Sequence, residues 1–346
     1  MDAAVAAYRI ELPEGSLDIH DLTVGTPDGD APVVLAVHGI TANGLAWQCV
    51  ADELFRRRGP GAVRFLAPDL RGRGGSRTAP GPYGLRVHAD DLAAIADVFG
   101  ATPLLLGHSM GAYVAALAAA AHRDRVSGVV LVDGGLAFPV DPALDVDAAL
   151  RSVIGPAMDR LTMRFASPDS YLGFWSGHPA LGPAMLRPEG AAVRRYLLHD
   201  LVRADAAGRG DGSGDTPRDG AGSGAGSGAG SIAGAGDGDG GPWVSSCVLD
   251  AVRADGADVL ADATAHSAVS EAVAAGATVE LVWAERGLLD EPQGLYDPQR
   301  LAALDLPREL VTTAAAGVNH YTVILAEEGV TTVVDAVERQ LGRIIR

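Results

Sequence analysis

A serine between two glycines is the residue of this sequence best placed for nucleophilic chemistry. Ser109 lies in Gly-His-Ser-Met-Gly, residues 107–111, after the apolar run 104–106 and before an alanine-rich segment, 114–121. This order predicts a buried strand, a sharp turn and a helix, the setting of a nucleophile elbow. Glycines tolerate strained backbone, and a helix N-terminus favours negative charge beside the serine. The alternative is a glycine-rich turn with an incidental serine, because the Gly-x-Ser-x-Gly pattern alone is weakly specific.

A hydroxyl becomes a good nucleophile only when a base accepts its proton and a third group orients that base. His320 follows the last expected strand, in Val318-Asn319-His320-Tyr321, and comes after Ser109 in the chain. A lone histidine can also be a satisfied residue of the core or the surface. Its place in the order of elements nevertheless favours His320 as the base.

Backbone N–H groups beside the serine are expected to stabilise the oxyanion that forms during acyl transfer. Met110 would supply one, and a residue after the first core strand would supply the other, for which Ile40 is the candidate. His38, Gly39 and His108 flank the same place in the sequence. We interpret these three residues as shaping the substrate pocket.

The elements that must position these residues alternate between strand and helix. The short apolar runs are continuous rather than alternating, which predicts a mostly parallel, doubly wound sheet covered on both faces. Catalytic residues gather at the carboxyl ends of such strands. Residues 1–30 predict two antiparallel edge strands. The sequence predicts core strands at 33–37, 63–67, 104–106, 126–132, 278–283 and 309–311, and helices at 47–57, 87–99, 114–121 and 331–345.

A long insertion interrupts this alternation. Residues 137–275 predict a helical cap between two sheet strands, and residues 208–241 within it are low-complexity Gly, Ala, Ser and Asp, typical of a flexible loop. The expected division is therefore core 1–136, cap 137–275 and core 276–346. We expect some of the bulky cap side chains to line a pocket: Met158, Met163, Phe165, Tyr171, Phe174, Trp175, Met185 and Tyr196.

Composition limits the possible partners. The chain has 346 residues, 48% of them hydrophobic, and a formal net charge of −17, which argues against nucleic-acid binding. Cys49 and Cys247 are far apart and match no metal-ligand spacing. No signal-peptide pattern opens the chain, and no apolar stretch reaches the roughly 20 residues of a membrane span. We expect a cytoplasmic protein that acts on a small molecule; the sequence does not indicate its oligomeric state.

Taken together, these motifs resemble the α/β-hydrolase superfamily, in its capped, esterase- and lipase-like branch. The resemblance covers roughly residues 17–135 and 276–346 and excludes the cap. It implies a Ser–His–acid triad and neither a metal nor an organic cofactor. Serine at the elbow disfavours the epoxide hydrolases and haloalkane dehalogenases of this fold, which carry aspartate there. The motifs are His38-Gly39, Pro68-Asp69-Leu70-Arg71-Gly72-Arg73-Gly74-Gly75-Ser76, Gly107-His108-Ser109-Met110-Gly111 and Asn319-His320.

The acid of the implied triad is the departure from the family pattern. Relatives usually carry Gly-x-x-Asp just after the penultimate strand, but alignment on Val282-Trp283 places Ala284 and Gly287 at those two positions. A shift of three residues aligns Gly287-Leu288-Leu289-Asp290 and makes Asp290 the first candidate. Asp133, at the end of an earlier strand, is the alternative. Glu285, or no acid at all, also remains open.

The expected reaction is hydrolysis of a small, largely apolar ester or related acyl substrate through an acyl-enzyme. The same triad can hydrolyse a carbon–carbon bond or a thioester, or carry out cofactor-free perhydrolysis, because the fold does not choose between these reactions. From a different class, a non-catalytic small-molecule binder on a hydrolase scaffold is a further alternative.

Overall fold

The computed structural model describes residues 6–12, 15–138, 145–204 and 241–344. The flexible loop expected at 208–241 therefore lies outside the described residues, apart from Gly241. Within the described ranges, no helix is both long enough and apolar enough to cross a bilayer.

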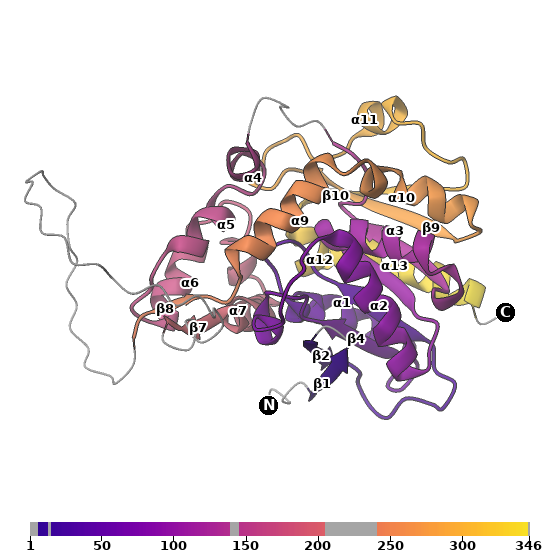
Figure 1. Cartoon of the computed structure of the whole chain (residues 1–346), viewed down its shortest axis with the longest axis horizontal. Helices are drawn as coiled ribbons and strands as arrows, with labels where there is room; N and C mark the ends of the chain where they lie inside the picture. The colour runs from indigo at the N-terminus through magenta and orange to yellow at the C-terminus, as the bar shows by residue number, and fades with distance from the viewer. Residues whose placement is uncertain (1–5, 13–14, 139–144, 205–240, 345–346) are drawn as a thin grey trace, which may run out of the picture.

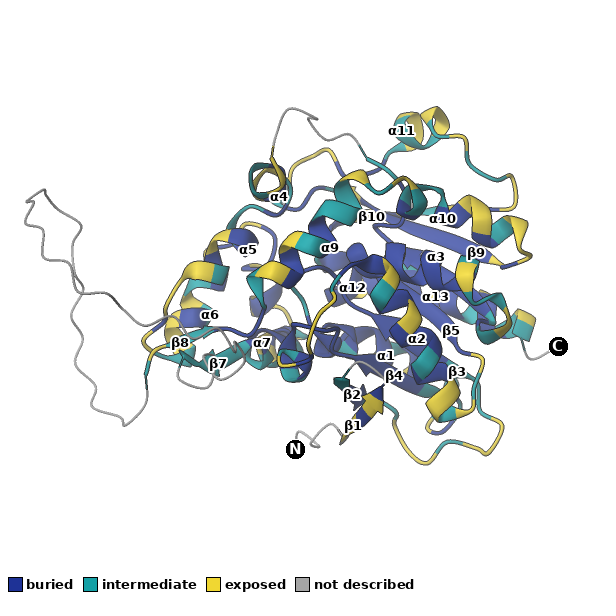
Figure 2. Cartoon of the chain, in the orientation of Figure 1, coloured by how far each residue is buried: buried dark blue, intermediate teal, exposed yellow. Residues whose placement is uncertain are grey.

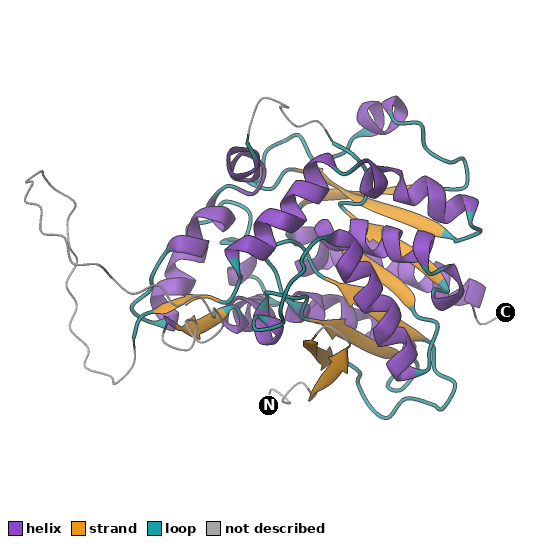
Figure 3. Cartoon of the chain, in the orientation of Figure 1, coloured by secondary structure: helices purple, strands orange, loops and turns teal. Residues whose placement is uncertain are grey.

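An eight-stranded sheet with the order β1-β2-β4-β3-β5-β6-β9-β10 forms the centre of the molecule (Figure 3). β1 pairs antiparallel with β2, and β2 pairs antiparallel with β4, whereas the other neighbours are parallel. This confirms the mostly parallel sheet with two antiparallel strands at one edge. The strands are β1 (Ala6–Leu12), β2 (Gly15–Asp21), β3 (Val33–Val37), β4 (Arg64–Pro68), β5 (Leu104–His108), β6 (Gly128–Val132), β9 (Val279–Arg286) and β10 (Val311–Asn319).

Helices cover both faces of the sheet, and the central strands are buried as their continuous apolar runs predict (Figures 1 and 2). One layer contains α1 (Gln48–Arg58), α12 (Thr322–Leu325) and α13 (Glu327–Ile344), and the other contains α2 (Leu85–Phe99), α3 (Met110–Ala121) and α10 (Ala263–Ala274). The remaining core segments are η1 (Gly44–Trp47), η2 (Gly74–Ser76), η3 (Arg123–Arg125) and α11 (Pro298–Ala303).

The insertion between β6 and β9 forms the cap, seen at the left of Figure 1. It contains α4 (Val146–Ile154), α5 (Pro156–Asp159), η4 (Arg160–Thr162), α6 (Pro168–Ser176), η5 (Ala184–Leu186), α7 (Gly190–His199), β7 (Leu201–Arg203), β8 (Trp243–Ser245) and α9 (Leu249–Ala261). The sequence did not predict the antiparallel pair β7–β8. Helix α10, which we had placed in the cap, packs on α3 and leads into β9, so it belongs to the core.

Aromatic side chains hold the cap together. Phe165 packs edge-to-face on Tyr171 with ring centroids 4.9 Å apart, and Phe174 packs in the same way on Trp175 at 5.3 Å. Of the bulky cap residues named from the sequence, Tyr196 lines a cavity beside Ser109. Packing inside the cap, rather than contact with a ligand, therefore explains most of the bulky residues of this insertion.

Candidate active site

Ser109 occupies a strained turn between β5 and α3. Its backbone angles are φ 55° and ψ −121°, and its N–H donates to the carbonyl oxygen of Val132 at the end of the neighbouring strand. A non-glycine residue in this region costs about 1–3 kcal/mol, which persists only where the surroundings enforce it. The structure therefore has the elbow geometry that the sequence predicts.

The glycines of the elbow are needed for close approach of backbone. A Cβ on Gly107 would overlap the carbonyl oxygen of Gly111, and one on Gly111 would overlap that of Val37. Neither glycine has a positive φ, so the strain lies on Ser109 itself and not, as we expected, on its glycine neighbours. Tight packing of the α3 N-terminus on β3 and β5 is what fixes the serine.

His320 and Asp133 form a buried pair at the same edge of the sheet. His320 directly follows β10 and Asp133 directly follows β6, and they are 3% and 0% exposed. The Nδ1 atom of His320 lies 2.6 Å from Oδ2 of Asp133, while Oδ1 of Asp133 accepts a hydrogen bond from the N–H of Ala284 at 3.0 Å. With Nδ1 donating to the carboxylate, Nε2 is the ring nitrogen left to accept a proton.

Asp290, the acid favoured by the shifted Gly-x-x-Asp alignment, has other partners. Its Oδ1 accepts hydrogen bonds from Nε of Arg286 at 2.7 Å and from Nδ2 of Asn319 at 3.1 Å. The hydrogen bond and charge of Arg286 hold the pKa of this half-exposed carboxyl below its ordinary value. The structure thus brings Asp133, and not Asp290, to His320. Glu285 lies elsewhere and accepts from the N–H of Gly317.

His38 is a backbone anchor rather than a pocket residue. It is fully buried, Nε2 accepts from the N–H of Leu70 at 3.0 Å, and Nδ1 therefore carries the proton that it donates to the carbonyl oxygen of Gly39 at 2.8 Å. Burial lowers the pKa of His38 to about 4, so the ring is neutral at neutral pH. Our expectation that His38 contacts substrate is not supported by this placement.

His108 lies beside His320 at the end of β5. Its Nε2 donates to the carbonyl oxygen of His320 at 2.8 Å, and the two rings pack at a tilt of 38° with centroids 4.7 Å apart. Burial holds the pKa of His108 well below its ordinary value, so the ring that packs against His320 is neutral. His108 and Gly39 also line a cavity with Ser109.

Two small cavities meet at Ser109 and His320, each about 30 Å³ in volume. Ile40, Ile154 and Leu288 line both, so the two spaces are neighbours. The first also has Gly39, Thr41, Ala42, Ala46, His108, Tyr196, Tyr321, Ile324 and Leu325 in its wall, and the second has Met110, Tyr113, Asp133, Gly134, Phe138, Leu150, Val153, Val259, Leu260 and Leu295. Apart from Tyr196, the cap residues among them were not singled out in the sequence, because nothing local indicates which cap side chains face the serine.

Known proteins resemble this chain in sequence and in structure. The sequence model of the alpha/beta hydrolase fold matches residues 32–156. The crystal structure of E-2-(acetamidomethylene)succinate hydrolase superimposes with a TM-score of 0.61 over 98% of this chain and 100% of that one, at 19% identity. The chain has the α/β-hydrolase fold.

Two curated relatives match part of this chain. Lipase LipV of Mycobacterium tuberculosis is 36% identical over 138 residues, which is 39% of this chain and 49% of that protein. The 2-(acetamidomethylene)succinate hydrolase of Mesorhizobium japonicum is 32% identical over 135 residues, 38% of this chain and 47% of that protein. The chain thus spans about half the length of the curated relatives it matches.

A histidine–aspartate–histidine cluster joins the cap to the core. Nε2 of His199, at the end of α7, lies 2.7 Å from Oδ2 of Asp69, and Nε2 of His20 from β2 lies 3.1 Å from Oδ1. Each carboxylate oxygen also accepts a backbone N–H, from Gly44 or Gly75. Burial would raise the pKa of Asp69, but its contacts with His199 and His20 outweigh burial and hold that pKa well below its usual range.

We expect His199 to make stability depend on pH. Burial lowers its pKa, but the hydrogen bond and charge of Asp69 outweigh burial and raise it above the ordinary 6.5. A raised histidine pKa contributes stability that is complete below about pH 6.5 and is lost as the pH rises through the folded-state pKa. The free energy of unfolding of the wild type minus that of His199→Gln, measured by urea titration, should therefore be larger near pH 6 than near pH 9. The subtraction cancels the histidines outside this cluster, and a difference that grows with pH would contradict this assignment.

Proposed function

We propose that this chain is a serine hydrolase that cleaves a small, largely apolar ester or related acyl substrate. Ser109 is the nucleophile, His320 the base and Asp133 the acid. The observation that carries the proposal is the 2.6 Å contact between His320 Nδ1 and Asp133, beside a cavity that Ser109 and His320 line together. An oriented base next to a strained serine is the arrangement that nucleophilic acyl transfer requires.

The proposed reaction has two half-reactions. Oγ of Ser109 attacks the acyl carbon while Nε2 of His320 takes the hydroxyl proton, and His320 then gives that proton to the oxygen of the leaving alcohol. A water molecule attacks the acyl-enzyme, transfers a proton through His320 back to Ser109, and releases the acid. The N–H groups of Ile40 and Met110 stabilise the negative oxygen in both steps, and both residues line the cavity with Ser109.

The walls of both cavities favour a substrate without charge. No arginine is among the described residues that line the two cavities, and the nearby Tyr113 uses its hydroxyl on the carbonyl oxygen of Leu136. A substrate carboxylate there would lose its hydration without gaining a cation, which is strongly unfavourable. A relative is named for an acetamidomethylene succinate, a dianionic substrate, whereas these walls suit an uncharged acyl group better. The small volumes suit short chains, and longer ones would require the cap to move.

A fluorophosphonate probe tests the proposal directly, because it phosphonylates only an activated serine. The wild type is expected to be labelled and Ser109→Ala is not, with both proteins shown to be folded by circular dichroism. Absence of labelling in the folded wild type would overturn the serine-hydrolase proposal and favour a non-catalytic binder.

A pair of matched esters tests the substrate class. p-Nitrophenyl butyrate and p-nitrophenyl hemisuccinate have acyl chains of the same length and differ by a terminal carboxylate. The neutral ester should have a kcat/KM at least about tenfold higher, because each buried, unpaired charge costs well over 1.4 kcal/mol. Equal values would contradict the apolar assignment. A butyryl thioester in the same panel distinguishes thioester hydrolysis.

A further inference from the structure

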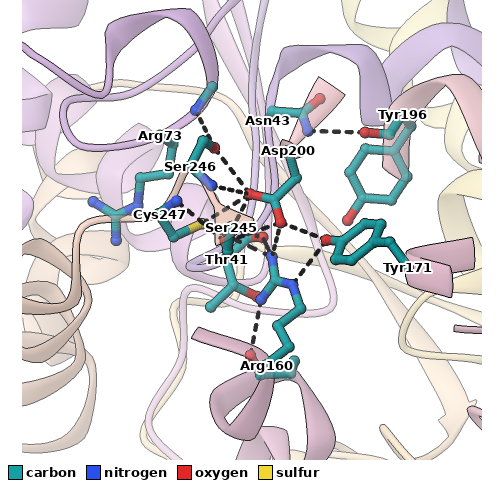
Figure 4. Close-up of polar contacts among 12 residues, drawn as sticks. Thr41, Asn43, Arg73, Arg160, Tyr171, Tyr196, Asp200, Ser245, Ser246 and Cys247 are labelled. Atoms are coloured by element: carbon teal, nitrogen blue, oxygen red, sulfur yellow. Dashed lines mark hydrogen bonds and ion pairs between the residues drawn. The ribbon is translucent and has the colours of Figure 1, made fainter. Parts of the chain in front are cut away.

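A buried arginine of the cap reaches the loop that would form the oxyanion hole. Arg160, in η4, is 2% exposed, and its Nη2 donates to the carbonyl oxygen of Thr41 at 2.7 Å. Its Nη1 donates to the carbonyl oxygen of Ala157 at 2.8 Å, and its Nε to the hydroxyl of Tyr171 at 3.1 Å (Figure 4). Three bonds in different directions hold the planar guanidinium in one orientation.

Asp200 compensates the charge of this arginine. Its Oδ2 lies 3.1 Å from Nη2 of Arg160 and accepts from the hydroxyl of Tyr171 at 2.5 Å. Its Oδ1 accepts from the hydroxyls of Ser245 and Ser246, each at 2.9 Å. Figure 4 shows these groups converging on the carboxylate. The buried Arg160–Asp200 pair is therefore held in one geometry, with the remaining lone pairs of the carboxylate satisfied. Removal of one partner alone would be strongly destabilising, because it would leave an uncompensated buried charge.

The oxyanion loop, residues 39–43, has three successive carbonyl groups held by three side chains. His38 donates to the oxygen of Gly39, Arg73 donates through Nε to that of Ile40 at 3.0 Å, and Arg160 donates to that of Thr41. His38 and Arg73 belong to the core, and Arg73 pairs with Asp255. Arg160 is the one of these three donors that the cap supplies.

These contacts fix the direction of the N–H of Ile40, because they hold the peptide planes of the loop. In a trans peptide the C=O and the N–H point in opposite directions. Arg160 fixes the plane between Thr41 and Ala42, whose N–H donates to the oxygen of Gly39 at 3.1 Å. That oxygen belongs to the peptide plane between Gly39 and Ile40, two planes earlier, in which it points away from the N–H of Ile40. Holding Thr41 therefore helps to hold the Ile40 donor.

We propose that Arg160, held by Asp200 and Tyr171, is a positioning residue that completes the oxyanion hole from the cap side. The inference rests on the proposed function, since it concerns the donor of that same site. It means that oxyanion stabilisation depends on a cap that is docked on the core, and not only on residues of the core.

The test uses the double variant Arg160→Met/Asp200→Asn, which removes both buried charges and so avoids leaving one unpaired. With p-nitrophenyl butyrate, kcat should fall about 10- to 100-fold, because loss of a whole oxyanion donor costs about 10²- to 10³-fold. KM should change by less than about threefold, and the affinity for butylboronic acid, a tetrahedral analogue, should fall in parallel with kcat/KM. Tyr171→Phe, which removes one hydroxyl, should show a smaller loss in the same direction.

A matched control separates positioning from general loosening of the cap. Arg253→Met/Asp147→Asn removes an arginine–aspartate pair between α9 and α4 that lies at the surface of the cap. This control should keep kcat and boronate affinity within about twofold of the wild type. A merely structural role of Arg160 would raise KM and lower the melting temperature while kcat and the boronate-to-substrate ratio stayed constant, and that result would overturn the proposal.

Amide hydrogen exchange gives a readout that does not need hydrolysis. The peptide containing residues 39–43 should exchange faster in Arg160→Met/Asp200→Asn than in the control, because Arg160 no longer holds the peptide plane that directs the N–H of Ala42 to the oxygen of Gly39. Unchanged exchange would overturn the positioning role even if the wild type proved inactive. Failure of the fluorophosphonate to label the wild type would overturn the proposed function alone, so the two failures are distinguishable.

Discussion

Replacement of Asp133 by asparagine is expected to lower kcat about 10⁴-fold while KM stays nearly constant. Asp133 accepts the Nδ1 proton of His320 and is fully buried. An asparagine can instead donate its amide to Nδ1, which leaves the proton on Nε2 and removes the atom that must deprotonate Ser109. Steady-state hydrolysis of p-nitrophenyl butyrate measures the effect.

Asp290→Asn is the matched control for this prediction. Asp290 lies on the loop after β9 and pairs with the half-exposed Arg286, so its loss should change kcat by less than about threefold. If Asp290→Asn lowered kcat more than Asp133→Asn, the acid would be Asp290, as the Gly-x-x-Asp alignment favours. Equal and small effects would mean that no acid orients His320.

Ser109→Gly should abolish hydrolysis and at the same time stabilise the fold. Loss of the nucleophile alone costs about 10⁶-fold in kcat where it acts within a triad. Glycine adopts φ 55° and ψ −121° without the strain that serine incurs there. Relief of that strain should stabilise the folded state by about 1–3 kcal/mol, but glycine loses more conformational entropy on folding, which costs about 0.5–1 kcal/mol. The free energy of unfolding should therefore rise by about 1 kcal/mol.

The comparison with Ser109→Ala isolates the backbone effect. Alanine also removes the hydroxyl but keeps the Cβ, so it should be as inactive as the glycine variant without the gain in stability. Urea unfolding of the three proteins measures the difference. If Ser109→Gly were the least stable of the three, the elbow would not be the strained position that its backbone angles indicate.

The strands and helices near Ser109 were predictable because their signals are local. The apolar run, the glycines and the alanine-rich segment fix β5, the turn and α3 within a short stretch of chain. Likewise, His320 follows β10 as expected, although β10 extends over Val311–Asn319 and not only 309–311. A β-branched run that continues into small residues gives no clear end point in sequence.

The pairing of the acid was not predictable in this way. Which carboxylate meets His320 depends on the register of β6, β9 and β10, and that register shifts between Ala315 and Asn319. Strand β9 also runs on to Arg286, three residues past the expected end, which places Asp290 beside that arginine. The family pattern measures distance along the chain, whereas the contact is decided by the ends of neighbouring strands.

The cap limits were missed for a related reason. An alanine-rich helix has the same sequence pattern whether it packs on the core or belongs to the cap. For this reason α10 could be assigned to the core only from its packing on α3. Similarly, Arg160 gives no sign in sequence that it is buried, because arginine is usually exposed.

The strands that flank the insertion are direct neighbours, with Val129 opposite Val279 and Val132 opposite Val282. These two strands are parallel, so the chain leaves the sheet after Val132, and α10 returns it to the opposite edge, where β9 begins. The cap is therefore an insertion within one crossover between adjacent strands, and the three proposed triad residues all lie outside it. Recombination could exchange one lid for another during evolution without moving the triad, and so change which molecules are accepted while the chemistry is inherited intact. An exchanged lid would also have to bring a group that replaces the arginine at Thr41, which restricts the donors from which a working chimera could be built.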